Sequence, residues 1–184
     1  FILNNLKDNN KLFKRYRDGI SSIDGMIEDY AFLIWGLIEL YQLTFDLDYL
    51  NEAKILSDYQ IDNFWDQKDK GFYFYDINSE SLIVRPKEVY DGAIPSGNSV
   101  SAYNFMRLSK ILNNEKYKQI ANETINTFSN QINRSGSGYT MMLHAVDYDF
   151  GPSYEVIITG SYEDPQTQTI LNEVYNSKNL NKIV

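Results

Sequence analysis

The 184-residue sequence is organised by an internal repeat. At an offset of about 68 residues, two stretches with helical periodicity match one another. The matched pairs are Leu40 and Leu108, Leu43 and Ile111, Tyr49 and Tyr117, and Ala53 and Ala121. Upstream, Asp24-Gly25 matches Asp91-Gly92 at an offset of 67. The sequence therefore predicts two copies of one supersecondary unit.

Each copy contains two predicted helices of different character. The first helix of each pair, residues 27–45 and 98–112, is apolar on nearly all sides, which is typical of a helix buried on most sides. The second, residues 49–65 and 115–132, carries one apolar stripe. Inner buried helices paired with one-sided outer helices indicate helical hairpins stacked in two concentric layers, as in a ring or a solenoid.

Shorter elements are predicted between and after these helices. Residues 71–75 and 82–84 are aromatic or β-branched runs that predict a hairpin at one rim, and residues 11–17 predict one side of another. Residues 1–9 have the pattern of the end of an outer helix. After Gly138 the repeat fades. The remaining predictions are a short helix at 139–145, a buried strand at 154–159, a helix at 165–175 and a strand from 182.

Composition argues against several classes of function. The 25 acidic and 17 basic residues give a net charge of −8, which disfavours nucleic-acid binding. No apolar run approaches the ~20 residues that a membrane helix needs. With no cysteine and one histidine, we expect neither a metal site nor a cofactor. The glycine-containing segments 97–99 and 136–138 lack the Lys-Ser/Thr ending of a phosphate-binding loop.

Polar residues gather where the two inner helices begin. Because the two starts match at an offset of 67 to 68, both clusters are expected at the same end of neighbouring helices, opening onto the cavity of a ring. The cluster consists of Glu28, Asp29, Asp91, Ser96, Asn98 and Ser99. Helix capping is the alternative explanation, because acidic side chains favour a first turn and Ser or Asn satisfies free N–H groups.

Carboxylates beside aromatic side chains suit a carbohydrate ligand. Aromatic faces pack on sugar rings and carboxylates accept hydrogen bonds from hydroxyl groups. We therefore take Glu28, Asp29 and Asp91 as candidate catalytic residues, with Tyr30 and Trp35 as a packing surface. Neighbouring helical residues point about 100° apart, so hydrolysis would require either Glu28 or Asp29 to pair with Asp91 across the helices.

Two residues outside the cluster carry chemistry. Arg85, just before Pro86, is a candidate donor to an anion or a hydroxyl group, with a plain surface charge as the alternative. His144 is expected to be a packed or surface side chain rather than a catalytic one, because no second histidine or cysteine accompanies it.

Several segments resemble the YyaL family, which includes the spermatogenesis-associated protein 20 group. The most specific is Asp91-Gly92-Ala93-Ile94-Pro95-Ser96-Gly97-Asn98-Ser99, and the weaker ones are 17–19, 28–32, 36–41 and 71–74. The likeness covers nearly the whole chain. It implies an N-terminal thioredoxin-like domain joined to a six-hairpin (α/α) toroid, with this chain similar to the C-terminal part of that toroid. Related toroids in epimerases and glycosidases act on sugars, but the histidine pair of the epimerases has no counterpart here.

The expected fold is therefore mainly α, a partial (α/α) six-hairpin toroid with short rim β-hairpins and a small C-terminal β-α-β element. We expect residues 1–184 to form one toroid portion, with units at about 24–90 and 91–150 and the C-terminal element at 151–184. Apolar faces left uncovered at the two cut ends would favour self-association.

Two functions follow from these expectations. The first is binding or modification of a sugar or another polyhydroxylated small molecule, by isomerisation or hydrolysis if there is a reaction. The alternative is a non-catalytic scaffold or docking domain that serves a thioredoxin-like redox domain. The resemblance implies as partners that domain and the early hairpins, and we expect a cytoplasmic location.

Overall fold

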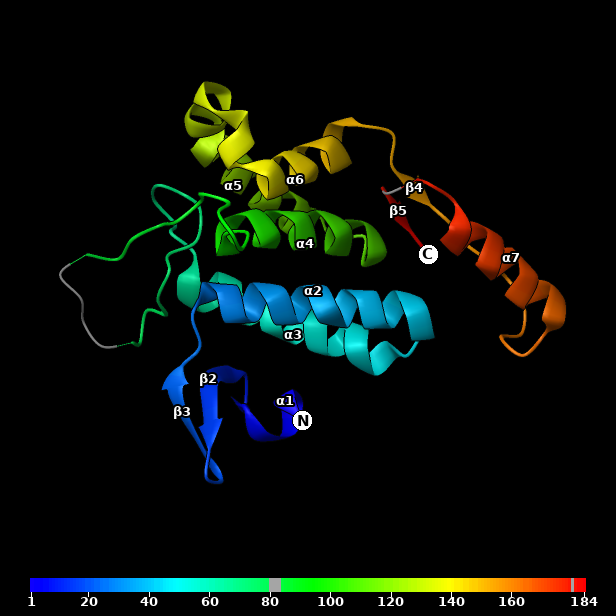
Figure 1. Cartoon of the computed structure of the whole chain (residues 1–184), viewed down its shortest axis with the longest axis horizontal. Coiled ribbons are helices and arrows are strands. Elements are labelled where there is room, and N and C mark those ends of the chain that lie inside the picture. Colours follow the sequence, from blue (N-terminus) through cyan, green and yellow to red (C-terminus); the bar gives the residue numbers. More distant parts are fainter. Residues whose placement is uncertain (80–83, 180) are drawn as a thin grey trace.

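Two helical hairpins form the centre of the molecule. The computed structural model describes residues 1–79, 84–179 and 181–184. Helix α2 (Ile27–Thr44) packs on α3 (Leu47–Phe64), and α4 (Gly97–Ile111) packs on α5 (Glu115–Arg134). Helix α4 also packs on α2 and on α6 (Thr140–Phe150), so α2, α4 and α6 form one row. Figure 1 shows this row side by side in front, with α3 behind α2. The four long predicted helices are confirmed.

Local chemistry sets where these helices begin and end. The side chain of Asp46 accepts a hydrogen bond from the N–H of Asp48 (2.9 Å) and starts α3, and Asn114 does the same for the first turn of α5. Helix α2 ends where Phe45 adopts a left-handed φ of 57°. Side-chain caps satisfy N–H groups that have no partner within the helix. The second helix of each hairpin can therefore begin within a few residues of the end of the first.

The core lies between the inner row and the outer helices. Tyr30 of α2 stacks on Tyr59 of α3 with ring centroids 5.2 Å apart, and Phe105 of α4 meets Tyr117 of α5 edge-on at 5.3 Å. Almost every side chain of α4 is buried, as predicted for an inner helix. Helix α2 is buried towards α3 and α4, but it leaves Leu40 exposed on another side.

A small antiparallel sheet precedes α2. It contains β1 (Lys7–Asp8), β2 (Lys11–Arg17) and β3 (Ile20–Asp24). Asp18 and Gly19 join β2 to β3 with positive φ at both positions, the geometry of a tight hairpin turn. The hairpin expected around residues 11–17 is therefore confirmed. Of the outer-helix end expected at residues 1–9, only α1 (Ile2–Asn5) is helical.

The second rim hairpin does not form as predicted. Residues 71–75 contain no strand, and Phe72 makes only an isolated bridge with Trp65. The reason is a tertiary contact: the side chain of Asn98 bonds both the N–H and the C=O of Phe72, which occupies the groups that a partner strand would use. Leu82 and Ile83, in the other predicted arm, lie outside the described residues.

The C-terminal region contains the expected strand, helix and strand. They are β4 (Tyr154–Glu155), α7 (Pro165–Asn176) and β5 (Lys182–Ile183), with β4 and β5 parallel. The strand predicted over 154–159 ends at Glu155, and the prediction that it is buried is wrong, because both residues of β4 are exposed and Ile157 is 86% exposed. With only the two-residue β5 as its neighbour, this segment has no sheet in which to be buried. The helix expected at 139–145 extends to Phe150 as α6.

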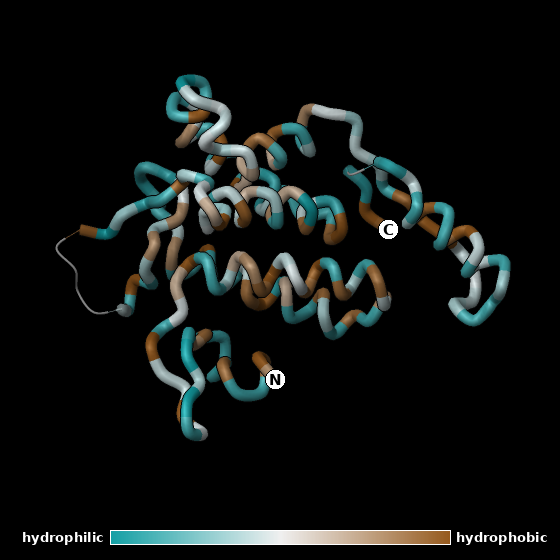
Figure 2. Tube along the Cα trace, viewed as in Figure 1, coloured by the Kyte–Doolittle hydropathy of each residue, from teal (hydrophilic) through white to brown (hydrophobic). Residues whose placement is uncertain are grey.

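Polar positions interrupt the apolar ones along the helices, as the alternating teal and brown of Figure 2 shows. Among the described residues, no helix combines the length and the hydropathy that crossing a bilayer demands.

Candidate functional site

Asp91 lies at the start of the α4 unit and is only 8% exposed. Its Oδ1 accepts a hydrogen bond from the N–H of Ser96 (2.9 Å), and its Oδ2 accepts from Met141 (2.8 Å) and Met142 (3.2 Å). The two methionines are in the first turn of α6. Asp91 therefore caps α6 from the loop that precedes α4, and both of its oxygens are occupied by backbone groups.

The other polar residues at this helix start are also held internally. Asn98 is fully buried, and besides Phe72 it donates to the carbonyl of Glu88 (2.8 Å). Ser96 is the N-cap of α4: its Oγ accepts from the N–H of Ser99 (3.1 Å) and donates to the Ser99 hydroxyl. Capping and loop bracing account for all three side chains.

At the start of α2, the two adjacent carboxylates differ. Asp29 accepts a hydrogen bond from the N–H of Met26 (2.8 Å) and caps the helix. Glu28 makes no side-chain hydrogen bond to any described residue. Partial burial raises the pKa of Glu28, Glu88 raises it further, and Lys14 opposes the shift. Glu28 is thus the member of the cluster whose carboxylate stays available.

Tyr30 and Arg85 are placed away from an open surface. The hydroxyl of Tyr30 accepts a hydrogen bond from the N–H of Leu12 (2.8 Å), and burial raises its pKa to about 12. Arg85 donates to the carbonyl of Tyr75 (2.7 Å) and lies 4.1 Å from the centroid of the Tyr73 ring. Tyr30 therefore joins the sheet to the core, and Arg85 braces the rim segment.

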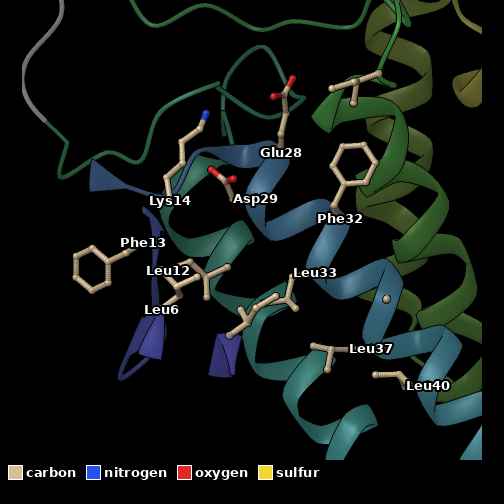
Figure 3. A pocket seen from close by; sticks show the side chains of 13 residues that line it. Leu6, Leu12, Phe13, Lys14, Glu28, Asp29, Phe32, Leu33, Leu37 and Leu40 are labelled. Atoms are coloured by element: carbon tan, nitrogen blue, oxygen red, sulfur yellow. The ribbon is translucent and has the colours of Figure 1, made fainter. Parts of the chain in front are cut away.

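A groove of about 750 Å³ runs along α2 on the side of β2 and α1. We call it the α2 groove. Figure 3 shows Glu28 and Lys14 at one end and leucine side chains along the rest. Its apolar lining consists of Ile2, Leu6, Leu12, Phe13, Phe32, Leu33, Leu37, Leu40 and Ile94. The groove is suited to packing against another apolar surface.

A row of three side chains crosses the inner helices on the side away from α3 and α5. Trp35 of α2 meets Tyr103 of α4 edge-on, with centroids 6.1 Å apart, and Tyr103 lies 4.5 Å from the ring of His144 of α6. Trp35 and His144 are partly exposed. We call these residues the inner-face row. Trp35 was predicted as a site residue, His144 was expected to be packed or on the surface, and Tyr103 was missed.

An ion pair lies one turn further along the same two helices. Nη1 of Arg107 donates to Oε1 of Glu39 at 2.7 Å, and the same oxygen accepts a hydrogen bond from Nε1 of Trp35 (3.0 Å). The Arg107 guanidinium also lies 5.1 Å from the centroid of the Tyr103 ring. These contacts join the ion pair to the inner-face row.

The repeat contained the signal for these missed residues. Trp35 and Tyr103 are 68 positions apart, and so are Glu39 and Arg107. Equivalent positions on two neighbouring inner helices face the same side, so this offset pairs residues that meet across the row. The apolar matches and the helix starts share this offset visibly, whereas Glu39 and Arg107 are unlike side chains and do not stand out as a match.

A second pocket of about 430 Å³ opens beside Arg107, where the C-terminal segment folds back against α2 and α4. We call it the floor pocket. It is lined by Glu39, Gln42, Leu43, Tyr103, Arg107, Tyr175, Ser177, Asn179, Lys182 and Val184. The hydroxyl of Tyr175 donates to the carbonyl of Gln42 (2.7 Å), which fixes α7 against the end of α2.

The surroundings of His144 lower its pKa below the ordinary value for an imidazole. Burial lowers its pKa, Arg107 lowers it further and Asp147 raises it.

Among the described residues, no group of three or more His, Asp or Glu side chains could hold a metal ion.

The sequence is related to named proteins over most of its length, although no protein-family model matches it. Over 161 residues, or 87% of the chain, it is 29% identical to spermatogenesis-associated protein 20 of Rattus norvegicus, and the same figures hold for the Mus musculus and Homo sapiens proteins. The chain is homologous to spermatogenesis-associated protein 20. It spans about a fifth (20%) of the length of these relatives.

Two solved structures have a fold similar to that of this chain. A GH76 α-mannanase from Bacteroides thetaiotaomicron aligns with a TM-score of 0.50 at 14% identity, covering 85% of this chain and 53% of that one. The unsaturated glucuronyl hydrolase of Bacillus sp. GL1 aligns at 0.52 and 13%, covering 95% and 51%. The chain thus matches about half of a six-hairpin toroid, which confirms the expected partial toroid.

Proposed function

We propose that the inner face of this segment forms part of a binding cavity for a carbohydrate or a similar polyhydroxylated ligand. One observation carries the proposal: the aromatic pair Trp35 and Tyr103 lies beside the ion pair Glu39 and Arg107 on the side of α2 and α4 that faces away from the outer helices. In a ring of helical hairpins that side faces the central cavity.

The chemistry of these four side chains suits a sugar. The partly exposed indole of Trp35 offers an apolar face to the C–H groups of a ring. Glu39 presents its second carboxylate oxygen as a hydrogen-bond acceptor, and Arg107 presents N–H donors. Because Oε1 of Glu39 is held by both Trp35 and Arg107, the arrangement is fixed before a ligand binds, which lowers the entropic cost of binding.

The fold supports the same class of ligand. By their names, the two solved structures are an α-mannanase and a glucuronyl hydrolase responsible for degradation of glycosaminoglycan. Their likeness to this chain is one of fold, so the ligand class is our proposal and depends on the residues of the inner face.

The residues proposed to transfer protons are fewer than the sequence suggested. Asp29 and Asp91 are engaged by backbone N–H groups, whereas Glu28 lies on the same side of α2 as Trp35 and Glu39. We propose Glu28 as the proton donor if the cavity performs isomerisation or hydrolysis. Glu28 and Glu39 are 11 residues apart, or about 16 Å along a helix, too far for a hydrolytic pair. The carboxylate that raises the pKa of Glu28 by its negative charge is instead that of Glu88.

The test measures saturation transfer from the 184-residue chain to mannose, glucose, glucuronate and mannobiose by NMR. Trp35→Ala should remove the transfer, because the apolar face of the indole is lost. The matched control is Tyr16→Ala, which removes an exposed aromatic side chain on β2, away from the inner face. Equal transfer in wild type and Trp35→Ala would contradict the proposal.

The second candidate function is a scaffold that docks other domains, including a thioredoxin-like one. The α2 groove favours it, because an apolar groove of this size beside an exposed helix face is suited to protein packing. If docking is the main role, groove variants will lose a partner domain while Trp35→Ala keeps it.

A further inference from the structure

Arg107 is a buried cation whose hydrogen bonds are incomplete. Its side chain is 3% exposed, and its only hydrogen bond to a described residue runs from Nη1 to Glu39. Nε is buried without a partner. Leaving a buried N–H of a charged group unpaired is costly, so an arginine in this state calls for a further acceptor.

The position of Arg107 in the fold does not explain why the cost of an unpaired buried N–H is tolerated. Arg107 lies four residues before the end of α4, and its side chain donates to Glu39 and not to a backbone carbonyl, so no capping role explains it. Its partner Glu39 is 56% exposed, so solvent competes for that carboxylate. The guanidinium lines the floor pocket, and the edge formed by Nε and Nη2 makes no hydrogen bond to the described residues.

The charges of the floor pocket favour an anion. Its lining side chains include two cations, Arg107 and Lys182, and one carboxylate, Glu39. The ammonium group of Lys182 is already occupied, because it donates to the carbonyl oxygens of Val174 and Ser177 at the end of α7. Arg107 is therefore the cation that remains available to a ligand.

We propose that the floor pocket binds the carboxylate of an acidic sugar through Nη2 of Arg107. A hydrogen bond from an ionised guanidinium to a carboxylate is shorter and stronger than one between neutral groups. Glu39 and Tyr103 line the same pocket and contact the hydroxyl groups and ring of the ligand. The inference rests on the proposed carbohydrate function and narrows it to acidic sugars.

The test compares three ligands of nearly the same shape by titration calorimetry on the 184-residue chain. Glucuronate carries the carboxylate, glucuronamide replaces it with a neutral amide, and glucose lacks the group. Glucuronate should bind about tenfold or more tightly than glucuronamide, since a partly buried charge pair contributes at least that factor. Arg107→Lys should remove this preference, because the shorter ammonium side chain does not place an N–H donor at the position of Nη2.

A second variant covers the case in which replacing the buried Arg107 prevents folding. Glu39→Gln keeps the size of an exposed side chain and removes the internal competitor for Arg107, so it should raise the affinity for glucuronate severalfold relative to the affinity for glucose. Lys118→Gln, which removes an exposed cation on α5, is the matched control and should change neither affinity.

The outcomes separate this inference from the proposed function. Equal affinities for glucuronate and glucuronamide, or an unchanged ratio of glucuronate to glucose affinity in Glu39→Gln, would overturn the acidic-sugar inference and leave the carbohydrate function standing. Binding of acetate as tight as that of glucuronate would overturn the sugar class. If no sugar produces saturation transfer in the wild-type chain, the proposed function itself fails.

Discussion

Polar residues at the N-terminal ends of α2 and α4 make different contacts from those two to three turns further along the same helices. At the N-terminal ends of α2 and α4, Asp29, Asp91 and Asn98 direct their side chains to backbone groups. Two to three turns along, Arg107 is buried with an unpaired N–H, and Trp35 keeps part of its ring exposed. Apart from Glu28, the polar side chains of the first region are engaged within the protein, whereas the second region has unused donors and surface.

This difference separates polar side chains that stabilise the fold from polar side chains that remain available to a ligand. A helix start has N–H groups that need acceptors, so polar residues there are explained first by the backbone. A mid-helix position has no such need. A buried charge in mid-helix therefore points to a ligand more strongly than a larger polar cluster at a helix start does.

The largest expected effect is on stability at the helix starts. Asp91→Ala leaves three buried N–H groups without an acceptor and should lower the free energy of unfolding by about 3–5 kcal/mol. Asp91→Asn retains one acceptor oxygen and should cost less. Urea unfolding followed by circular dichroism measures both. Unchanged stability together with lost sugar binding would return Asp91 to the ligand site.

A smaller effect is expected from Tyr30, which lies on the opposite side of α2 from the inner face. Tyr30→Phe removes the acceptor for the N–H of Leu12 and should cost about 1–2 kcal/mol of unfolding free energy. Sugar binding should not change, because the ring stays packed on Tyr59. If the variant loses saturation transfer with little loss of stability, Tyr30 belongs to the ligand surface after all.

The α2 groove should produce weak self-association, which the inner face should not. Leu40, 42% exposed in the groove, provides the test. Light scattering at rising concentration should show association of the wild-type chain and a monomeric Leu40→Glu, because a charge there opposes apolar packing. Leu47→Glu, at an exposed position of α3, is the control and should associate like wild type. A wild-type chain that stays monomeric would contradict this role of the groove.

The smallest effect concerns the pH dependence contributed by His144. Burial lowers its pKa below the ordinary value of about 6.5, so between these two values the unfolded chain binds a proton that the folded chain does not. Stability should therefore fall as the pH drops from 7 through this window. His144→Gln should flatten that slope in thermal melts at pH 7, 6 and 5, and an unchanged slope would assign it to other groups.

Much of the helical framework was predictable because it depends on periodic burial. The 3.6-residue stripes and the offset of 68 identified α2 to α5, and the same pattern anticipated an inner row with outer helices behind it. The division into units at 24–90, 91–150 and 151–184 stays a prediction.

The errors arose where tertiary contacts override local patterns. Residues 71–75 look like a strand, but Asn98 takes the backbone groups of Phe72. The candidate site was only partly predictable for a related reason: capping and ligand binding favour the same residue types, and only coordinates show whether Asp91 faces a cavity or a backbone. Arg107 was missed because it lies among buried residues without a polar motif around it.

The contacts of Asp91 also bear on the order in which the chain acquires its structure. Its Oδ2 reaches residues 50 and 51 positions later in the sequence, in the first turn of α6. The loop before α4 therefore gains its final hydrogen bonds only after α6 has formed. During synthesis, that loop would emerge from the ribosome without them and would become protected from hydrogen exchange together with α6, as a single cooperative step.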